Sequence, residues 1–223
     1  ERGPMPPVGP TQDGGRFVEI WNLVFTQFQR KDGGVLEPLP QRNIDTGMGF
    51  ERTVRVVESL AAGRTLESNF ETTLFAPLMQ AIHSHVGHET EFGTPEGIHA
   101  RRIADHVRAA VFGISDGVRP SNLKQGYVIR KVLRRAMIDR HRLGADLRKP
   151  WLGKLADIVI DTMGGQYPAL REGRAVITGT ITGEEEKFTS TFLAASNRLV
   201  DVVQTARERG ESVLSGTDAF LLY

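Results

Sequence analysis

The sequence contains no cysteine, and this absence removes several chemistries at once. Disulfide bonds, thiolate metal sites and cysteine nucleophiles are all excluded. A chain without cysteine is compatible with a reducing compartment, although it does not prove one. The sequence also has no apolar run near the roughly 20 residues that a membrane span needs, and no signal-peptide pattern. We therefore expect a cytoplasmic protein with no membrane partner.

A strong net charge is missing too, because 28 basic and 27 acidic residues leave a formal net charge of +1. This charge is unevenly distributed. Residues 101–150 hold 13 basic and four acidic side chains, a net charge of +9, so the rest of the chain carries −8. A basic block in an otherwise acidic chain indicates a polyanionic partner, with nucleic acid the first candidate. A solvated helix face that happens to be basic is an equally good explanation from charge alone.

The length of 223 residues allows one large or two small domains, and the hydrophobic periodicity changes near residues 62–70. Before this point the pattern predicts a buried strand, a Gly-rich turn, a Pro-interrupted extended segment and a helix, over residues 17–28, 31–34, 36–43 and 50–62. After it the chain is almost wholly helical, with helices predicted over residues 71–86, 95–114, 123–142, 150–163, 169–181, 183–208 and 217–223. We predict an α+β protein with domains over residues 1–65 and 66–223.

The predicted helix over residues 123–142 separates its cations from its apolar side chains. At 100° per residue, one arc of about 140° holds Arg130, Lys131, Arg134, Arg135, His141 and Arg142. The opposite side holds Val128, Ile129, Val132, Leu133, Ala136 and Met137. One face can therefore pack on a core while the other presents cations to phosphates.

The loop before this helix, residues 117–122, is marked by Gly and Pro and ends at Asn122. A carboxamide both donates and accepts hydrogen bonds, as reading a base edge requires. A lone loop asparagine is more often a turn or cap residue, so this position alone decides nothing.

Glu19 and Asn22 are polar residues within an apolar strand pattern. A buried carboxylate is costly unless it is paired or binds a cation, so Glu19 is a candidate Mg²⁺ ligand. The alternative is an edge strand with Glu19 facing water. Residues i and i+3 of a regular strand face opposite sides, so the two share a site only at a bulge or a strand end.

Residues 45–52 form a second candidate site. Gly47 and Gly49 allow a ligand to approach the backbone, and the N-terminus of the following helix can hold an anion. Arg52 adds a positive charge in the first turn, and Asp45 can accept a hydrogen bond from an ammonium group. The pattern is neither a Rossmann nor a P-loop motif, and a plain strand–turn–helix junction explains it as well.

Three histidines, His83, His85 and His88, lie close together in the sequence. On a helix only His85 and His88 share a face, and no acidic residue completes a ligand set. We expect an exposed, histidine-rich helix end rather than a metal site.

Several segments resemble a known family. Residues 16–25, 38–40 and 43–52 are similar to the end of the catalytic domain of alanyl-tRNA synthetases. Residues 102–108, 116–122 and 126–136 resemble the domain of that family that recognises the tRNA acceptor stem, and residues 184–188 also fit. The similar segments occur in the same order along nearly the whole chain.

The resemblance implies a class II synthetase catalytic domain with an antiparallel sheet, followed by a helical RNA-recognition domain. It implies ATP, Mg²⁺, alanine and tRNA(Ala) as partners. The catalytic residues would be Arg52, Asp45 and Glu19. The ATP-binding residues would be Glu19, Gly47, Gly49 and Arg52, and the alanine-binding residues Asn22, Asp45 and Gly47. Asn122 would help to read a G·U wobble pair, and the further tRNA contacts would be Arg119, Lys124, Arg130, Lys131, Arg134 and Arg135.

The sequence also departs from the family pattern. Class II motifs 1 and 2 have no counterpart here, and neither does the zinc-binding editing domain, so zinc is expected only in that absent domain. Phe50 replaces the more usual leucine, a swap that a core tolerates. We therefore expect that the 223 residues alone do not form alanyl-adenylate. The alternative hypothesis is a stand-alone RNA-binding helical module with an incomplete active site.

Overall fold

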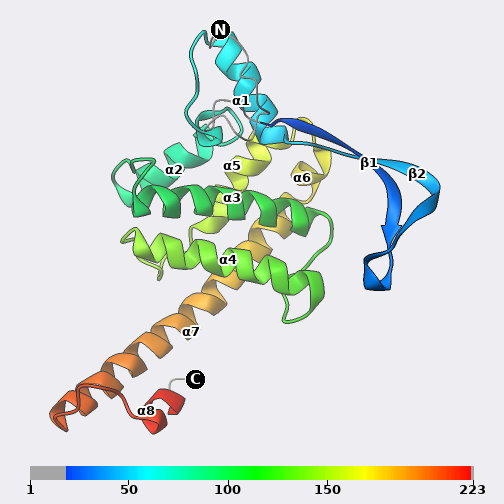
Figure 1. Cartoon of the computed structure of the whole chain (residues 1–223). Coiled ribbons are helices and arrows are strands. Elements are labelled where there is room, and N and C mark those ends of the chain that lie inside the picture. Colours follow the sequence, from blue (N-terminus) through cyan, green and yellow to red (C-terminus); the bar gives the residue numbers. More distant parts are fainter. Residues whose placement is uncertain (1–18, 222–223) are drawn as a thin grey trace. The chain divides into compact units, whose positions relative to one another are not determined.

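The computed structural model describes residues 19–221 and divides the chain into two compact units, Glu1–Leu74 and Phe75–Tyr223. The described residues are mostly helical, with one two-stranded antiparallel sheet (Figure 1). This composition agrees with the predicted α+β class. None of the helices in residues 19–221 combines the length and the apolarity needed to cross a membrane.

The first unit is built on a β-hairpin followed by a helix. Strand β1 (Trp21–Arg30) pairs antiparallel with β2 (Leu36–Met48), and α1 (Phe50–Ala61) begins directly afterwards. The connecting 3-10 turn (Asp32–Gly34) needs glycine, because Gly33 and Gly34 have φ of 77° and 84°. The predicted turn and helix are confirmed, whereas residues 17 and 18 of the predicted strand lie outside the described residues.

Two expectations about the hairpin were wrong. The strand predicted to be buried is exposed on both faces, with Trp21 at 59%, Val24 at 51% and Phe25 at 63%. A two-stranded ribbon cannot bury its own faces, so an apolar strand sequence does not guarantee a buried strand. The extended segment predicted over residues 36–43 was also too short, because β2 continues to Met48 and includes Asp45 and Gly47.

The second unit is a helical bundle. Its elements are α2 (Ala76–Val86), α3 (Pro95–Ser115), α4 (Lys124–Arg142), α5 (Leu152–Met163), α6 (Pro168–Glu172), α7 (Arg174–Glu208) and α8 (Gly216–Leu221). Helices α3 and α4 lie side by side (Figure 1). The core between the helices includes the buried side chains of Ile103, Val107, Val111, Leu133, Met137, Leu155, Ile160 and Ile177. Burying an aliphatic side chain of this size stabilises the fold by about 1.5–3 kcal/mol.

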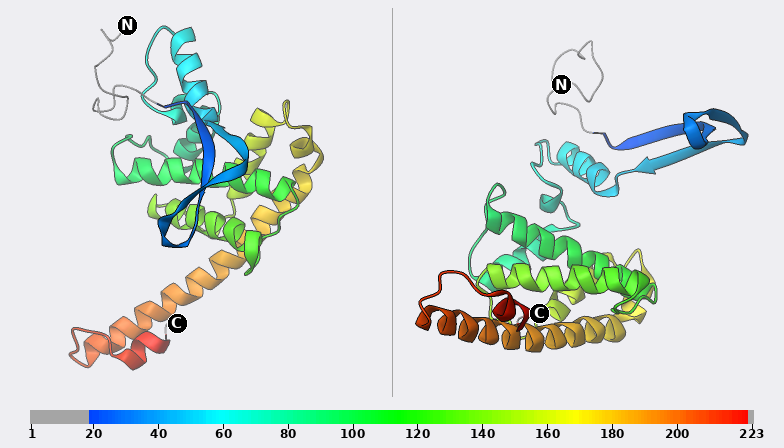
Figure 2. Two further views of the ribbon diagram at one scale, coloured as in Figure 1. Left: turned by 45° about the vertical axis from the view of Figure 1, so that its right-hand side comes forward. Right: turned by 60° about the horizontal axis from the view of Figure 1, so that its bottom comes forward.

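Local signals fix where several of these helices begin and end. Thr94 caps α3 by accepting a hydrogen bond from the Gly97 N–H at 3.1 Å, and Pro95 occupies the first turn. Gly87 ends α2 with φ of 86°, a conformation that favours glycine. Figure 2 shows α7 extending beyond the other helices, with α8 turned back beside its C-terminal end.

The helix predictions for residues 169–181 and 183–208 were wrong in one respect. Residues 174–208 form one continuous helix, α7, although residues 182–185 match the sequence pattern of a capping box, which usually marks the start of a helix. Glu184 and Glu185 are only 5% and 0% exposed, and they bind arginines of α4 instead of capping a helix. Tertiary ion pairs therefore override the local capping pattern.

Candidate functional site

The predicted site residues of the first unit gather where the hairpin meets α1. Asn22 Nδ2 donates a hydrogen bond to Glu19 Oε1 at 3.3 Å, and Asn22 Oδ1 accepts one from the Gly47 N–H at 3.2 Å. Glu19 precedes β1, so the alternation of strand faces does not separate it from Asn22. The structure thus brings the two polar residues together at a strand end, one of the two arrangements that the sequence allowed.

Arg52 joins this group from the first turn of α1. Its Nη1 donates to the Glu19 backbone oxygen at 2.9 Å. A Cβ atom at Gly49 would lie 3.3 Å from the Arg52 Cδ atom, so glycine leaves room for the arginine side chain to fold back. The Gly49 N–H also donates to the Ile20 oxygen at 2.8 Å, which ties the start of the helix to the hairpin. The Arg52 guanidinium has five N–H donors, and within residues 19–221 it makes one hydrogen bond, to the Glu19 oxygen, so its other donors can meet an anion.

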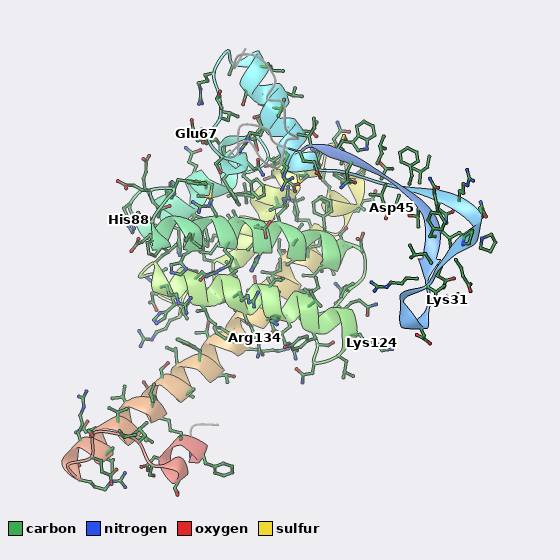
Figure 3. All side chains as sticks on the ribbon, in the orientation of Figure 1. Lys31, Asp45, Glu67, His88, Lys124 and Arg134 are labelled. Atoms are coloured by element: carbon green, nitrogen blue, oxygen red, sulfur yellow. The ribbon has the colours of Figure 1, made fainter. Side chains whose placement is uncertain are left out.

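Asp45 lies on the same face of the hairpin as Asn22. Asn22 pairs with Gly47 and Val24 pairs with Asp45, and residues two positions apart on a strand face the same side. Asp45 is exposed on the hairpin (Figure 3). This face therefore presents carboxylates that suit an ammonium group or a cation, next to a guanidinium that suits a phosphate.

The described residues fit a shared Mg²⁺ ion but not a dedicated metal cage. No group of three or more His, Asp or Glu side chains among them could hold a metal. Mg²⁺ usually takes one or two carboxylates and completes its octahedron with water and substrate phosphates. Glu19 can supply one such ligand.

The second unit places Asn122 at the start of α4 with a fixed orientation. Asn122 Oδ1 accepts a hydrogen bond from Arg130 Nη1, and Arg130 Nη2 donates to the Pro120 oxygen at 3.3 Å. The Asn122 Nδ2 group makes no hydrogen bond with residues 19–221, so it remains an exposed donor. The buried Gly126 lets the loop pack on the helix, because a Cβ atom there would lie 2.2 Å from Ser121 Oγ.

One carboxylate pairs with some, but not all, of the cations predicted on one face of α4. Glu184 Oε1 lies 3.1 Å from Arg130 Nε and 3.1 Å from Arg134 Nε, so α7 offsets the charge of these two arginines. Lys131 and Arg135 are exposed and form no ion pair within the described part of the chain. Figure 3 labels Arg134 on α4 and Lys124 at its first turn. Arg119, in the preceding loop, and Lys124 are likewise exposed.

Arg140, which the sequence places in the basic block, is not on the surface. It is 1% exposed, and its Nη1 donates to Glu185 Oε1 at 2.7 Å while its Nε donates to His85 Nε2 at 2.9 Å. Burial lowers the pKa of Arg140 and raises that of Glu185, and the ion pair acts against both shifts. The expectation of a wholly exposed histidine-rich helix end is wrong for His85, because its ring stacks on Trp151 with centroids 4.1 Å apart.

Sequence reasoning missed a cluster centred on Asp139. This carboxylate is 1% exposed and accepts hydrogen bonds from Arg102 Nε at 2.5 Å and Arg102 Nη2 at 2.6 Å, and it pairs with His99 Nδ1 at 2.8 Å. Beside it lies an open pocket of about 350 Å³ lined by Arg102, Arg135, Ile138, Asp139 and Arg142. The spacing 135–138–139–142 marks one helix face, but only the packing of α4 against α3 reveals what that face meets.

Comparison with known proteins identifies the class of protein to which the chain belongs. The model of the family described as "tRNA synthetases class II (A)" matches residues 1–223, so the chain belongs to the class II tRNA synthetases. Among its relatives, the alanine–tRNA ligase of Pseudothermotoga lettingae is 41% identical over 214 residues, which cover 96% of this chain and 24% of that protein. The alanine–tRNA ligase of Parabacteroides distasonis is 42% identical over 214 residues (95% and 24%). That of Geobacillus kaustophilus is 37% identical over 218 residues (98% and 24%).

The predicted resemblance is therefore confirmed at the level of the family. The chain spans about a quarter of the length of the curated relatives that it matches.

Proposed function

We propose that the protein containing this chain is an alanine–tRNA ligase, which activates alanine with ATP and transfers it to the 3′ end of tRNA(Ala). The observation that carries the proposal is that relatives 37–42% identical to nearly the whole chain are alanine–tRNA ligases. The grouping of Glu19, Asn22 and Arg52 around the end of the hairpin supports it.

In this proposal the first unit supplies part of the activation site. Arg52 holds a phosphate of ATP, Asn22 lies near the alanine carboxylate, and Asp45 accepts a hydrogen bond from the alanine ammonium. Gly47 and Gly49 let both substrates approach the backbone. The alanine carboxylate then attacks the α-phosphate in line, and pyrophosphate leaves. The side chains contribute positioning and charge neutralisation. A Mg²⁺ ion on Glu19 and the phosphates would neutralise further negative charge.

The hairpin itself is proposed to be part of the larger antiparallel sheet of a class II catalytic domain. Its apolar side chains support this, because Trp21, Leu23, Phe25 and Ile44 are all more than half exposed in the described structure. An open ribbon cannot exclude water from a reacting phosphate. We therefore expect the 223 residues alone to bind RNA without activating alanine.

The second unit is proposed to recognise the acceptor stem of tRNA(Ala). Because Arg130 donates a hydrogen bond to Asn122 Oδ1, only the Nδ2 group of Asn122 is left to contact the RNA. This donor requires an acceptor atom on the G·U pair. Arg119, Lys124, Lys131 and Arg135 contact backbone phosphates, which position the RNA without reading its sequence. Arg130 and Arg134, which the sequence also assigns to the tRNA, share Glu184 and act mainly through the structure they hold.

Alanine activation is tested with Arg52→Gln in the full-length protein. We expect alanine-dependent ATP–pyrophosphate exchange to fall by about 100-fold or more, because a fixed charge at a reacting phosphate is removed. Arg30→Gln, at the far end of the hairpin, is the matched control and should leave exchange unchanged. Exchange that depends on an amino acid other than alanine, or that survives Arg52→Gln, would refute the assignment.

RNA recognition is tested with Asn122→Ala and Asn122→Asp. The aspartate keeps the acceptor for Arg130 but removes the Nδ2 donor. Both variants should lose about 1–3 kcal/mol of discrimination between tRNA(Ala) and a transcript with G·C in place of G·U, with a smaller loss of total binding. Competition binding with the two transcripts measures this. Retained discrimination in both variants would contradict the role of Asn122.

A further inference from the structure

Two neighbouring helices direct arginines into one open pocket. Helix α3 contributes Arg102, and α4 contributes Arg135 and Arg142 to a space of about 350 Å³. On α4 the lining residues recur at intervals of three and four, so they occupy one face of the helix. Arg135 is among the tRNA contacts expected from the sequence, whereas Arg102, Asp139 and Arg142 are not.

The charges of the pocket are only partly offset. Its single carboxylate, Asp139, is 1% exposed and receives both Arg102 hydrogen bonds, at 2.5 and 2.6 Å. Arg142 is 55% exposed and lies 3.6 Å from the same carboxylate. Arg135 forms no ion pair within residues 19–221. Three guanidiniums and one carboxylate leave an excess of positive charge, while the bidentate contact holds Arg102 in a fixed orientation.

This arrangement suits a tetrahedral oxyanion. A guanidinium fork pairs with two oxygens of a phosphate, and guanidiniums from two helices can contact one phosphate from different sides. The pocket is open, so one phosphate of a polymer can enter it while the rest of the polymer stays in solvent. The exposed Lys131 lies one helical turn before Arg135, so a strand with regularly spaced charges meets more than one cation.

We propose that this pocket binds a backbone phosphate of the bound RNA, with Arg102 fixed by Asp139 and with Arg135 and Arg142 completing the clamp. The inference rests on the proposed RNA-binding function and names where the strand is held. It divides four arginines of α4 into two pairs. Arg135 and Arg142 bind phosphate, whereas Arg130 and Arg134 bind Glu184.

The test measures the affinity of the 223-residue chain for a tRNA(Ala) transcript by fluorescence anisotropy over a range of KCl concentrations. Arg135→Gln and Arg142→Gln should each weaken binding about tenfold at low salt and lower the slope of log affinity against log salt by about one. Arg207→Gln is the matched control, because it removes the same charge from an exposed position in the last turn of α7. It should change the affinity less than twofold.

Arg135→Lys tests the geometry of the contact. It keeps the charge but loses the planar fork, so it should retain most of the salt slope and recover only part of the affinity. Circular dichroism of each variant checks the fold. Both arginines are exposed, and Asp139 keeps His99 and Arg102 when Arg142 is replaced.

Three outcomes would overturn the inference. If the salt slope is unchanged in both glutamine variants while Asn122 still discriminates G·U from G·C, the pocket does not bind an RNA phosphate. The proposed recognition of the acceptor stem is then unaffected. If the wild-type chain has no affinity for the transcript, both the phosphate contact in the pocket and the proposed RNA binding by the second unit are refuted. Inorganic phosphate that binds at micromolar concentration and is lost in Arg135→Gln, while RNA affinity is unchanged, assigns the pocket to a free anion.

Discussion

Arg140 joins several parts of the helical unit, and replacing it tests how that unit is held together. The guanidinium donates to Glu185 at 2.7 Å, to His85 at 2.9 Å, and to the backbone oxygens of Asp146 and Lys149 at 2.8 and 2.7 Å. Arg140→Met keeps a similar apolar stem and removes every one of these bonds. The substitution therefore isolates the charged head group.

The magnitude follows from what the methionine leaves behind. Glu185 is 0% exposed, and its other oxygen accepts the N–H groups of Trp151 and Leu152 at the start of α5. A buried carboxylate that loses its counter-charge destabilises a protein by about 3–5 kcal/mol. Since whole domains are stable by about 5–15 kcal/mol, this is a large fraction of the total. The urea midpoint should fall by about 2 M.

Arg134→Met is the matched control on the same helix. Arg134 is 46% exposed, and its partner Glu184 keeps Arg130 at 3.1 Å. A partly exposed pair whose carboxylate retains a second arginine contributes little, so we expect a loss of about 1 kcal/mol or less. The comparison separates burial of the ion pair from the removal of an arginine as such.

The assay uses the two tryptophans of the chain, Trp21 and Trp151. In a Trp21→Phe background, fluorescence reports only Trp151, which contacts Glu185 through its backbone and stacks on His85. Urea unfolding then follows the helical unit alone.

Equal midpoints for Arg140→Met and Arg134→Met would refute this reasoning. A second comparison tests the cause. Adding Glu185→Leu to Arg140→Met removes the orphaned charge, so the double variant should lose less than the sum of the single changes. Strict additivity would mean that the two charges do not interact.

Two further predictions concern the same unit. Burial first, and then the charges of Arg140 and Lys154, lower the pKa of His85 to about 4. Because this folded pKa lies below the usual 6.5, stability is full above about pH 6.5 and falls toward pH 4. The loss should be about 1–3 kcal/mol, reduced by partial exposure of the ring. Urea midpoints that are equal at neutral and mildly acidic pH would contradict this. Gly126→Ala should displace the loop that carries Asn122, since the new Cβ atom would lie 2.2 Å from Ser121 Oγ, and both the melting temperature and G·U discrimination should fall.

The candidate site of the first unit was predictable in part because its members are close in sequence to a turn or a helix start. The glycines at positions 47 and 49 and the arginine at 52 mark a strand–helix junction by local rules. The contact between Glu19 and Asn22 was left open, because it depends on where β1 begins, and strand ends are poorly fixed by pattern. The sequence also favoured burial for this hairpin, and the structure exposes it.

The helical unit shows where local rules are insufficient. The cations of α4 were placed on one face by their spacing, but spacing cannot distinguish an arginine that meets solvent from one that meets a carboxylate. Glu184 and Glu185, which resemble a capping pattern, lie 45 or more residues from the arginines that they bind. Such pairs form only after α7 packs on α4.

The sequence by itself determined the family, the order of the elements, and the concentration of positive charge in residues 101–150, because each depends on residue type and local spacing. Only the tertiary structure decided which of those charges are available. It buried Arg140, offset Arg130 and Arg134 with Glu184, and placed Arg102 beside Arg135 and Arg142. The physical reason is that a charge is neutralised by whatever packs against it, and helix packing brings together residues that are far apart along the chain.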